Sequence, residues 1–305
     1  MKGIAMSDQR IGWLGTGRLG TAMATRLLKG GTTNLTVWNR TASKAAALVA
    51  AGAGQVDTID ELTECDVVFT TVMASADLLA VTLNPGGLLT GKTAPKVIVD
   101  CSTVSEDAAN QVRSAAVDRG TAMLSAPVSG NAAMVAAGRA AIVASGPKEA
   151  FEAARGYLET IAASVVHCGQ NEEARLVKLC HNLLLGMITE ALAEVVTLSE
   201  KGGVAPAAFL DFINGTVLAS TFIENKGNAI RSRDYEPTFT SRSLRKDFDL
   251  GLAAARALEV PLPLAAATHQ LIQTAIGYGY GEDDYVTLYE LAARAAGIDR
   301  EDQSA

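Results

Sequence analysis

A closely spaced set of glycines near the start of the chain most restricts what it can fold into. Gly15, Gly17 and Gly20 follow the short apolar run Ile11–Leu14 with the spacing G-x-G-x-x-G. The first glycine permits a tight turn, the second lets the backbone approach a pyrophosphate, and the third lets the next helix pack closely on the strand. The pattern therefore predicts a strand, a phosphate-binding turn and a helix whose first N–H groups face the phosphates.

The flanking sequence supplies the context that this spacing requires. Apolar residues recur with helical spacing over Thr21–Lys29, a glycine pair ends that helix, and a second strand is predicted over Asn34–Trp38. We expect a dinucleotide to contact five consecutive residues of the turn: Gly15, Thr16, Gly17, Arg18 and Leu19.

The residues after the second strand indicate which dinucleotide binds. An NAD enzyme usually has Asp or Glu there, and its carboxylate accepts hydrogen bonds from the ribose hydroxyls. This chain has Asn39, Arg40 and Thr41 instead. A guanidinium beside an amide and a hydroxyl suits a 2′-phosphate, because arginine combines a permanent charge with a planar set of donors. We therefore predict NADP(H), the alternative being that Arg40 is an arginine of a solvated loop.

The distribution of apolar residues divides the chain into segments of different character. Strands and helices alternate along the first half, which predicts a doubly wound α/β domain with a parallel sheet. Residues 171–201 carry apolar side chains nearly all round a helix, as in a buried helix, and helical patterns continue to the end of the chain. We predict a tail over 1–9, a Rossmann-type NADP-binding domain over 10–170, a long interdomain helix over 171–201, and an all-helical substrate and dimerisation domain over 202–305.

Composition favours a soluble enzyme over several other classes of protein. The 305 residues are 49% hydrophobic and carry a formal net charge of −7, so the chain can bury a large core and has little affinity for nucleic acid. The four cysteines are scattered and form no C-x-x-C pair, which suggests a reducing compartment and no metal. No signal peptide or uncharged membrane span is evident. A cytoplasmic location is therefore expected.

Three further motifs, together with the glycine turn, resemble those of a known family. They are Asp100-Cys-Ser-Thr-Val104, Ala126-Pro-Val-Ser-Gly130, and the segment from Gly169 that contains Lys178 and Asn182. The chain resembles the β-hydroxyacid dehydrogenases, which include 3-hydroxyisobutyrate dehydrogenase and the NADPH-dependent glyoxylate and succinic semialdehyde reductases. The resemblance extends over 11–297. It implies four substrate or nicotinamide contacts, which are Ser102, Thr103, Ser129 and Gly130.

The same resemblance implies that Lys178 is the catalytic residue and that Asn182 assists it. The two residues are four apart, so both project from one face of the predicted long helix. A lysine acts as a general acid or base when its pKa falls toward neutrality, which burial and the positive nicotinamide of the oxidised cofactor would promote. Lys178 would then give a proton or hydrogen bond to a carbonyl oxygen as hydride arrives.

The resemblance also implies contacts that are less distinctive in sequence. Lys246, in the pair Lys246-Asp247, is similar to a residue that the family brings toward the cofactor, and Phe239 is similar to an aromatic residue of the substrate cleft. An exposed charge pair and a core phenylalanine are the alternatives. Val72 and Met73, which follow the third strand, are expected to touch the cofactor.

Five positions depart from the family pattern near the expected substrate loop. They are Ser125, Asn131, Met134, Val135 and His181. These changes are expected to alter the shape, charge and volume of the substrate site, so the exact substrate stays open.

Three functions are compatible with these motifs. The first is an NADP(H)-dependent dehydrogenase or reductase of a small carboxylate-bearing hydroxy acid or carbonyl compound. The second is an imine reductase, in which the catalytic lysine is typically replaced, and the third is a non-catalytic NADP-binding interaction module. The retained Lys178 and Ser129 favour the first. The apolar helices and the resemblance further predict a homodimer or homotetramer.

Overall fold

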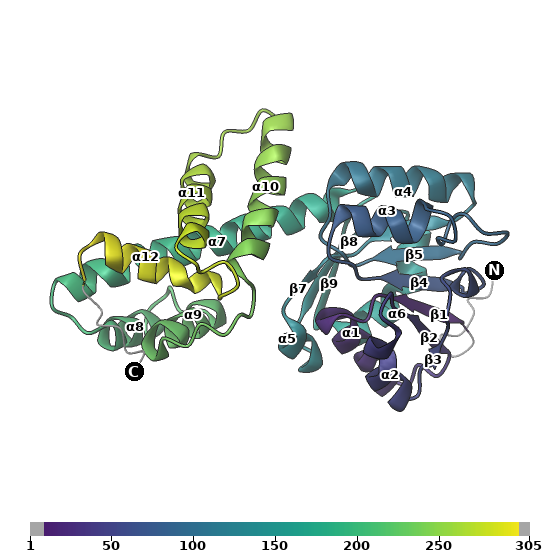
Figure 1. Ribbon diagram of the computed structural model, residues 1–305, viewed down its shortest axis with the longest axis horizontal. Coiled ribbons are helices and arrows are strands. Elements are labelled where there is room, and N and C mark those ends of the chain that lie inside the picture. Colours follow the sequence, from purple (N-terminus) through teal and green to yellow (C-terminus); the bar gives the residue numbers. More distant parts are fainter. Residues whose placement is uncertain (1–8, 299–305) are drawn as a thin grey trace. The chain divides into compact units, whose positions relative to one another are not determined.

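The computed structural model of the protein describes residues 9–298, and the chain divides into two compact units, Met1–Lys178 and Leu179–Ala305 (Figure 1). The predicted N-terminal tail, apart from Gln9, and the chain after Ile298 lie outside the described residues. The first unit contains a nine-stranded sheet with helices, and the described part of the second unit is helical.

Six parallel strands form the part of the sheet that the glycine turn predicts. Their spatial order is β3-β2-β1-β4-β5-β6, with β1 between β2 and β4. Their bounds are Ile11–Leu14 (β1), Leu35–Trp38 (β2), Gly54–Gln55 (β3), Val67–Thr70 (β4), Val97–Asp100 (β5) and Ala122–Ser125 (β6). The strands β1, β4 and β5 are buried along their whole length, as expected of parallel strands covered on both faces.

Helices cover both faces of this sheet. Val67 and Phe69 of β4 enter one core, which includes Leu27 of α1 and Leu158 of α6, whereas Val68 enters the other, beside α3 and α4. Figure 1 shows α3 and α4 on one face of the sheet and α1 and α6 on the other. The helices of this unit are α1 (Arg18–Lys29), α2 (Ala46–Ala50), α3 (Ser75–Leu83), α4 (Glu106–Asp118), α5 (Ala132–Ala136) and α6 (Lys148–Ile161). The predicted doubly wound α/β class is confirmed.

One side of the sheet departs from the parallel arrangement. It consists of β7 (Val128–Ser129), β8 (Ala141–Ser145) and β9 (Ser164–Gly169). β8 runs antiparallel to β6, and the two strands pair through their last residues, Ser125 and Ser145. The last residue of β6 therefore lies beside the last residue of β8, although the two strands run in opposite directions.

The second unit is all-helical, as predicted. Its helices after α7 (Glu173–Lys201) are α8 (Pro206–Asn214), α9 (Thr221–Ser232), α10 (Ser241–Ala257), α11 (Pro263–Gly277) and α12 (Leu288–Ala295), and the 3₁₀ turn η4 (Tyr285–Thr287) precedes α12. Pro206 and Pro263 occupy first-turn positions, where a missing N–H costs no helical hydrogen bond. Ser220 and Thr240 cap α9 and α10 through their hydroxyls.

Helix α7 (Glu173–Lys201) begins in the first unit and continues into the second. Among the described residues it is long and apolar enough, by length and composition, to cross a membrane, although half of its most apolar stretch is buried inside the protein. The helix carries charged residues, among them Glu190 and Glu194, so it is not the uncharged membrane span that the sequence analysis finds absent. The core helix of a globular protein has the same composition.

Glu190 is a buried acid on α7. Its Oε2 atom has no hydrogen-bond partner among the described residues. Burial, and secondarily the charge of Glu194, raise the pKa of Glu190 from its ordinary 4.5 to about 7. The folded protein therefore retains a proton there that the unfolded chain releases.

Replacing Glu190 by glutamine is expected to stabilise the protein at pH 8 and to change it much less at pH 5. The proton on Glu190 favours the folded state fully below the unfolded pKa, and this contribution is lost as the pH rises through about 7. Glutamine stays neutral, so it should avoid a loss of up to about 3 kcal/mol at pH 8. Thermal unfolding at both pH values measures the difference, with the exposed Glu236→Gln as the control. An equal shift at both pH values would contradict the assignment.

Candidate active site

The glycine turn has the backbone geometry that its sequence predicts. Gly15 has a φ of +98°, and a Cβ atom there would lie 2.1 Å from the Thr71 carbonyl oxygen, so only glycine fits. A Cβ on Gly20 would lie 2.1 Å from the Gly15 carbonyl oxygen, which shows how closely α1 approaches the turn. A Cβ on Gly17 would meet no atom within 4 Å. This side of the turn is open to a ligand.

The start of α1 offers polar groups to an anion. Gly17 is the N-cap residue, and no side chain caps the helix. The Thr16 hydroxyl is buried and has no hydrogen-bond partner among the described residues, whereas its backbone N–H donates to Asn39 Oδ1 at 2.8 Å. Uncapped helical N–H groups beside open space fit the pyrophosphate of a dinucleotide.

In the segment predicted to bind the 2′-phosphate, Asn39 is held by hydrogen bonds, whereas the side chain of Arg40 is exposed. Asn39 accepts from the Thr16 N–H and donates through Nδ2 to the Thr41 carbonyl oxygen at 2.9 Å. The Arg40 side chain is 86% exposed, and its Nη1 lies 3.3 Å from Asp77 Oδ1 of α3. Asp77 is absent from the sequence predictions, because no local pattern links residues 37 positions apart.

The segment after β4 is bonded to the segment after β5. The Val72 N–H donates to Ser102 Oγ at 2.9 Å, and Ser102 is almost fully buried. Met73, the next predicted cofactor contact, is 78% exposed. The predicted cofactor and substrate segments are therefore joined directly.

Lys178 lines a cavity of the first unit that is too narrow for a water molecule. The lysine is 8% exposed. The residues that line the cavity are Ser102, Thr103, Val104, Pro127, Arg175 and Lys178. The structure thus brings the predicted catalytic lysine together with Ser102 and Thr103, two of the four predicted substrate contacts. An ammonium and two hydroxyls are side-chain groups that can donate hydrogen bonds to an oxygen atom of a small ligand.

The other two predicted substrate contacts lie on β7 and just after it. Ser129 ends β7, and Gly130 has a φ of +132°, a conformation that favours glycine. Asn131 then caps α5, since its Oδ1 accepts from the Met134 N–H at 2.9 Å. Neither Ser129 nor Gly130 is among the residues that line the Lys178 cavity.

Several departures from the family pattern have partners inside the protein. Val135 is fully buried in the core of the first unit. Ser125 is fully buried and donates to Glu172 Oε2 at 2.7 Å. His181 Nδ1 lies 2.9 Å from Asn182 Oδ1. Together with Asn131, which caps α5, these positions have contacts inside the protein that the family motifs do not predict.

The remaining polar candidates meet in the second unit. Asn182 follows Lys178 by about one turn of α7, and its Nδ2 donates to Asp247 Oδ2 at 2.6 Å. Lys246 Nζ lies 3.3 Å from Asp247 Oδ1, and Asp247 is 1% exposed. The structure therefore joins Asn182 and Lys246 through a buried carboxylate.

Phe239 makes a packing contact within the second unit. Its ring meets that of Tyr285 edge-on, with centroids 6.2 Å apart, and it borders the hydrophobic core. A substrate contact at Phe239 stays a prediction.

A group of buried charges next to Lys178 is absent from the sequence predictions. Its members are the buried Asp100, Glu172 and Arg175, together with the partly buried Arg113. Burial alone would lower the pKa of Arg175, but the carboxylates of Asp100 and Glu172 raise it above its ordinary value. The i,i+3 spacing of Glu172 and Arg175 is the one local signal, and at the start of a helix such a pair usually indicates a solvated face.

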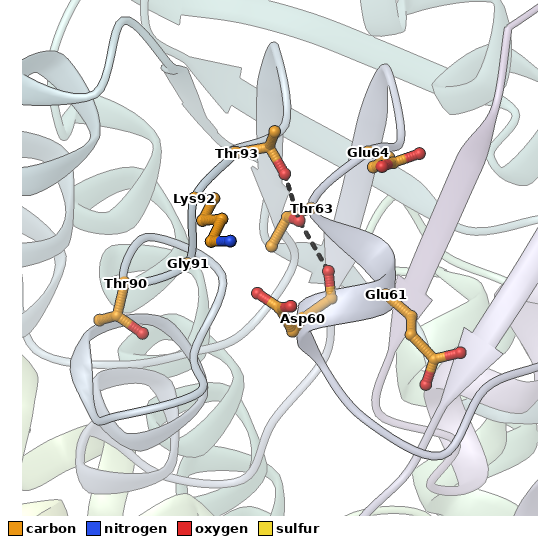
Figure 2. A pocket seen from close by; sticks show the side chains of 8 residues that line it. All are labelled: Asp60, Glu61, Thr63, Glu64, Thr90, Gly91, Lys92 and Thr93. Atoms are coloured by element: carbon orange, nitrogen blue, oxygen red, sulfur yellow. Dashed lines mark hydrogen bonds between the residues drawn. The ribbon is translucent and has the colours of Figure 1, made fainter.

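A surface hollow of the first unit lies away from these residues. Figure 2 shows its lining, which consists of Asp60, Glu61, Thr63, Glu64, Thr90, Gly91, Lys92 and Thr93. These residues precede β4 and β5 in the chain, so they lie at the amino ends of those strands. The predicted contacts lie instead at the carboxyl ends, where open α/β sheets bind ligands. Within residues 9–298, no group of three His, Cys, Asp or Glu residues could hold a metal ion.

Two protein families match nearly the whole chain. Residues 10–169 match the NAD-binding domain of 6-phosphogluconate dehydrogenase. Residues 173–292 match the NAD-binding domain of NADP-dependent 3-hydroxyisobutyrate dehydrogenase. The boundary between the two matches falls at the start of α7.

Curated relatives carry names of different kinds. The chain is 31% identical to the human cytokine-like nuclear factor N-PAC over 94% of its own length but only 52% of that protein, so it spans about half the length of the first relatives that it matches. It is 30% identical to the Arabidopsis thaliana chloroplastic glyoxylate/succinic semialdehyde reductase 2, covering 94% of this chain and 80% of that one. It is 31% identical to the Pseudomonas aeruginosa NAD-dependent L-serine dehydrogenase, covering 93% and 97% respectively.

The fold is shared with a solved dehydrogenase. The crystal structure of 3-hydroxyisobutyrate dehydrogenase from Salmonella typhimurium superimposes with a TM-score of 0.82 at 27% identity, over 93% of this chain and 100% of that one. The likeness extends over both units, each of which therefore has a counterpart in a known enzyme.

Proposed function

Because the chain belongs to the β-hydroxyacid dehydrogenase family of NAD(P)-dependent oxidoreductases, we propose that it transfers a hydride between NADP(H) and a small β-hydroxy acid or its semialdehyde. The substrate is of the 3-hydroxyisobutyrate, glyoxylate or succinic semialdehyde type. The observation that carries this proposal is the buried Lys178, which lines one cavity with Ser102 and Thr103.

The residues of the chain divide the work of binding and proton transfer. Lys178 Nζ donates a hydrogen bond and then a proton to the substrate carbonyl oxygen in reduction, and it accepts the hydroxyl proton in oxidation. Ser129 and the Gly130 N–H hold the substrate carboxylate, as donors hold an anion. Asn182 orients the lysine or the substrate. The bound nicotinamide supplies or accepts the hydride.

The cofactor would be held by three segments of the first unit. The uncapped start of α1 and the open face of Gly17 suit the pyrophosphate. Arg40 and Thr41 suit the 2′-phosphate. Val72 and Met73, after β4, lie at the carboxyl end of a strand next to β1, beside the turn.

Replacing Arg40 by alanine is expected to weaken NADPH binding about tenfold and to leave NADH binding within about twofold, because only the 2′-phosphate needs the guanidinium. Isothermal titration with each cofactor measures both affinities. Lys44→Ala, which removes a nearby charge, is the control. Equal losses for the two cofactors would contradict the assignment, and a wild-type preference for NADH would make the protein NAD-dependent, as its relative L-serine dehydrogenase is named.

A substrate panel tests the proposed reaction. NADPH oxidation is measured with glyoxylate, succinic semialdehyde, methylmalonate semialdehyde, tartronate semialdehyde and a cyclic imine, and NADP⁺ reduction is measured with L-serine and 3-hydroxyisobutyrate. We expect turnover of at least one carboxylate-bearing aldehyde or hydroxy acid, with loss of that turnover in Lys178→Ala.

Two other outcomes would replace this proposal. Turnover of the imine alone would make the protein an imine reductase, against which the retained lysine argues. NADPH binding without turnover of any compound would indicate an NADP-binding module. That possibility is relevant because N-PAC, a relative about twice as long, is named as a nuclear factor rather than as an enzyme.

We also propose that the protein associates with a second copy through its helical unit. Several large apolar side chains there are more than half exposed. They are Leu198, Phe212, Val217, Leu218, Leu258 and Leu264. Where exposed apolar side chains form a contiguous patch, they are typical of a surface that binds another protein.

A further inference from the structure

The start of α7 is bonded to the sheet by buried charges. Glu172 and Arg175 are 6% and 3% exposed, and Asp100 at the end of β5 is fully buried. Arg175 Nη2 lies 2.7 Å from Asp100 Oδ2, and Arg175 Nε lies 2.6 Å from Glu172 Oε2. One guanidinium therefore joins the first turn of the helix to a central strand.

Both carboxylate oxygens of Glu172 accept hydrogen bonds. Oε1 accepts from Arg113 Nε at 2.8 Å and lies 2.6 Å from Arg113 Nη2, and Oε2 accepts from Arg175 and from Ser125 Oγ. The backbone carbonyl of Glu172 accepts from the Arg175 N–H, so the residue begins the helix. A negative charge there also interacts favourably with the helix dipole.

The strand junction supplies a further anchor for the same turn. Ser145, which pairs with Ser125 where β8 meets β6, accepts from the Ala174 N–H at 3.0 Å and donates to the Asn171 carbonyl oxygen at 2.9 Å. The first turn of α7 is thus tied to the ends of β5, β6 and β8.

Arg175 also extends this set of bonds to the Lys178 cavity. Its Nη1 donates to the Ser102 carbonyl oxygen at 3.1 Å, and Ser102 N–H donates to Asp100 Oδ1. Arg175 precedes Lys178 by three residues and lines the same cavity. One network therefore fixes both the helical turn that carries Lys178 and the Ser102 backbone opposite it.

Stability alone does not account for burying Asp100, Glu172 and Arg175, because apolar side chains of similar volume dock a helix at least as well. Charged and bidentate hydrogen bonds also define the direction and the distance between the groups that they join. We propose that Glu172, acting with Arg175, is a positioning residue that holds Lys178 at the cavity and in register with Ser102. This inference rests on the proposed role of Lys178 in catalysis.

The test measures the position of Lys178 separately from activity. Lysine acetylation by an amine-reactive ester is followed by peptide mass spectrometry in the full-length protein and in Glu172→Gln. We expect Lys178 to be acetylated about tenfold faster in the variant. Lys226, a lysine equally buried in the other unit, should be acetylated at an unchanged rate.

Kinetics supply the second measurement. In Glu172→Gln, kcat should fall about 30-fold while KM and the dissociation constant of NADPH stay within about twofold, because a misplacement of about 1 Å can cost about 100-fold in rate. Ser125→Ala, which removes one neutral donor from Glu172, should shift both measurements in the same direction by about threefold. Glu173→Gln, the neighbouring acid, should leave both unchanged.

Two results would overturn the inference. One is an unchanged acetylation rate of Lys178 in Glu172→Gln, and the other is an equal increase at Lys178 and Lys226, which would indicate general loosening. Full activity in Lys178→Ala would instead overturn the proposed function, whatever the acetylation rates. The two failures are therefore distinguishable.

Discussion

Replacing Lys178 by alanine is expected to lower kcat about 1,000-fold, with the affinity for NADPH changed no more than about twofold. Proton transfer by a positioned side chain contributes roughly 10² to 10⁴ in rate, and Lys178 is the group proposed to transfer the proton. The lysine lines a cavity with Ser102 and Thr103, whereas the pyrophosphate is expected at the turn around Gly17. The substitution should therefore lower the rate of the chemical step without weakening the binding of NADPH.

Two further variants sharpen this test. Lys178→Arg keeps the positive charge but cannot release a proton near neutral pH, so it should be nearly as slow as the alanine variant. Lys201→Ala removes the lysine at the other end of α7, which bonds to the Gly297 carbonyl oxygen, and it should keep full activity. A Lys178→Arg enzyme with near-normal kcat would show that charge alone suffices and that Lys178 is not a general acid or base.

Replacing Asp284 by alanine is expected to destabilise the second unit by about 3–5 kcal/mol, because it leaves a buried charge without its partner. Asp284 lies 2.6 Å from Lys226 Nζ and also accepts from the Thr238 hydroxyl and N–H. Lys226 is 6% exposed, and its ammonium lies 3.9 Å from the centroid of the Tyr285 ring. Hydrogen exchange of the α9 and α10 amides measures the effect, since a chain of two units need not unfold in one step.

The control for Asp284 lies two residues away. Glu282 Oε1 is 2.8 Å from Arg242 Nε, but both side chains are more than half exposed, so Glu282→Ala should cost less than about 1 kcal/mol. Similar losses in the two variants would show that burial of the Lys226–Asp284 pair adds nothing to its importance. In that case η4 would be held by its apolar residues instead.

Features governed by local spacing could be predicted from the sequence. The G-x-G-x-x-G spacing requires a positive φ at Gly15 and close packing at Gly20, and both are observed. The apolar runs of β4 and β5 predict buried parallel strands, since few other structures cover both faces of a strand. Prolines at the starts of α8 and α11 act through their fixed φ, which needs no tertiary information.

Features that depend on distant segments could not be predicted in this way. The partner of Ser125 is Glu172, 47 positions later, and the partner of Arg40 is Asp77, 37 positions later. The antiparallel pairing of β8 with β6 is also non-local, and it determines which side chains surround the start of α7. A charged helix start normally predicts solvent, so the burial of Glu172 and Arg175 follows only from where the strands end.

The bonds at the start of α7 join residues that are far apart in the chain, which constrains the order in which the protein folds. Arg175 meets Asp100 across 75 positions, and Glu172 meets Arg113 across 59. Closing such long loops is slow unless intervening structure has already brought the ends together. During synthesis from the N-terminus, β4, β5 and β6 emerge before α7 and present the bonding groups of their ends. The Lys178 cavity should therefore be among the last parts of the first unit to form, after most of the hydrophobic core of that unit has excluded water.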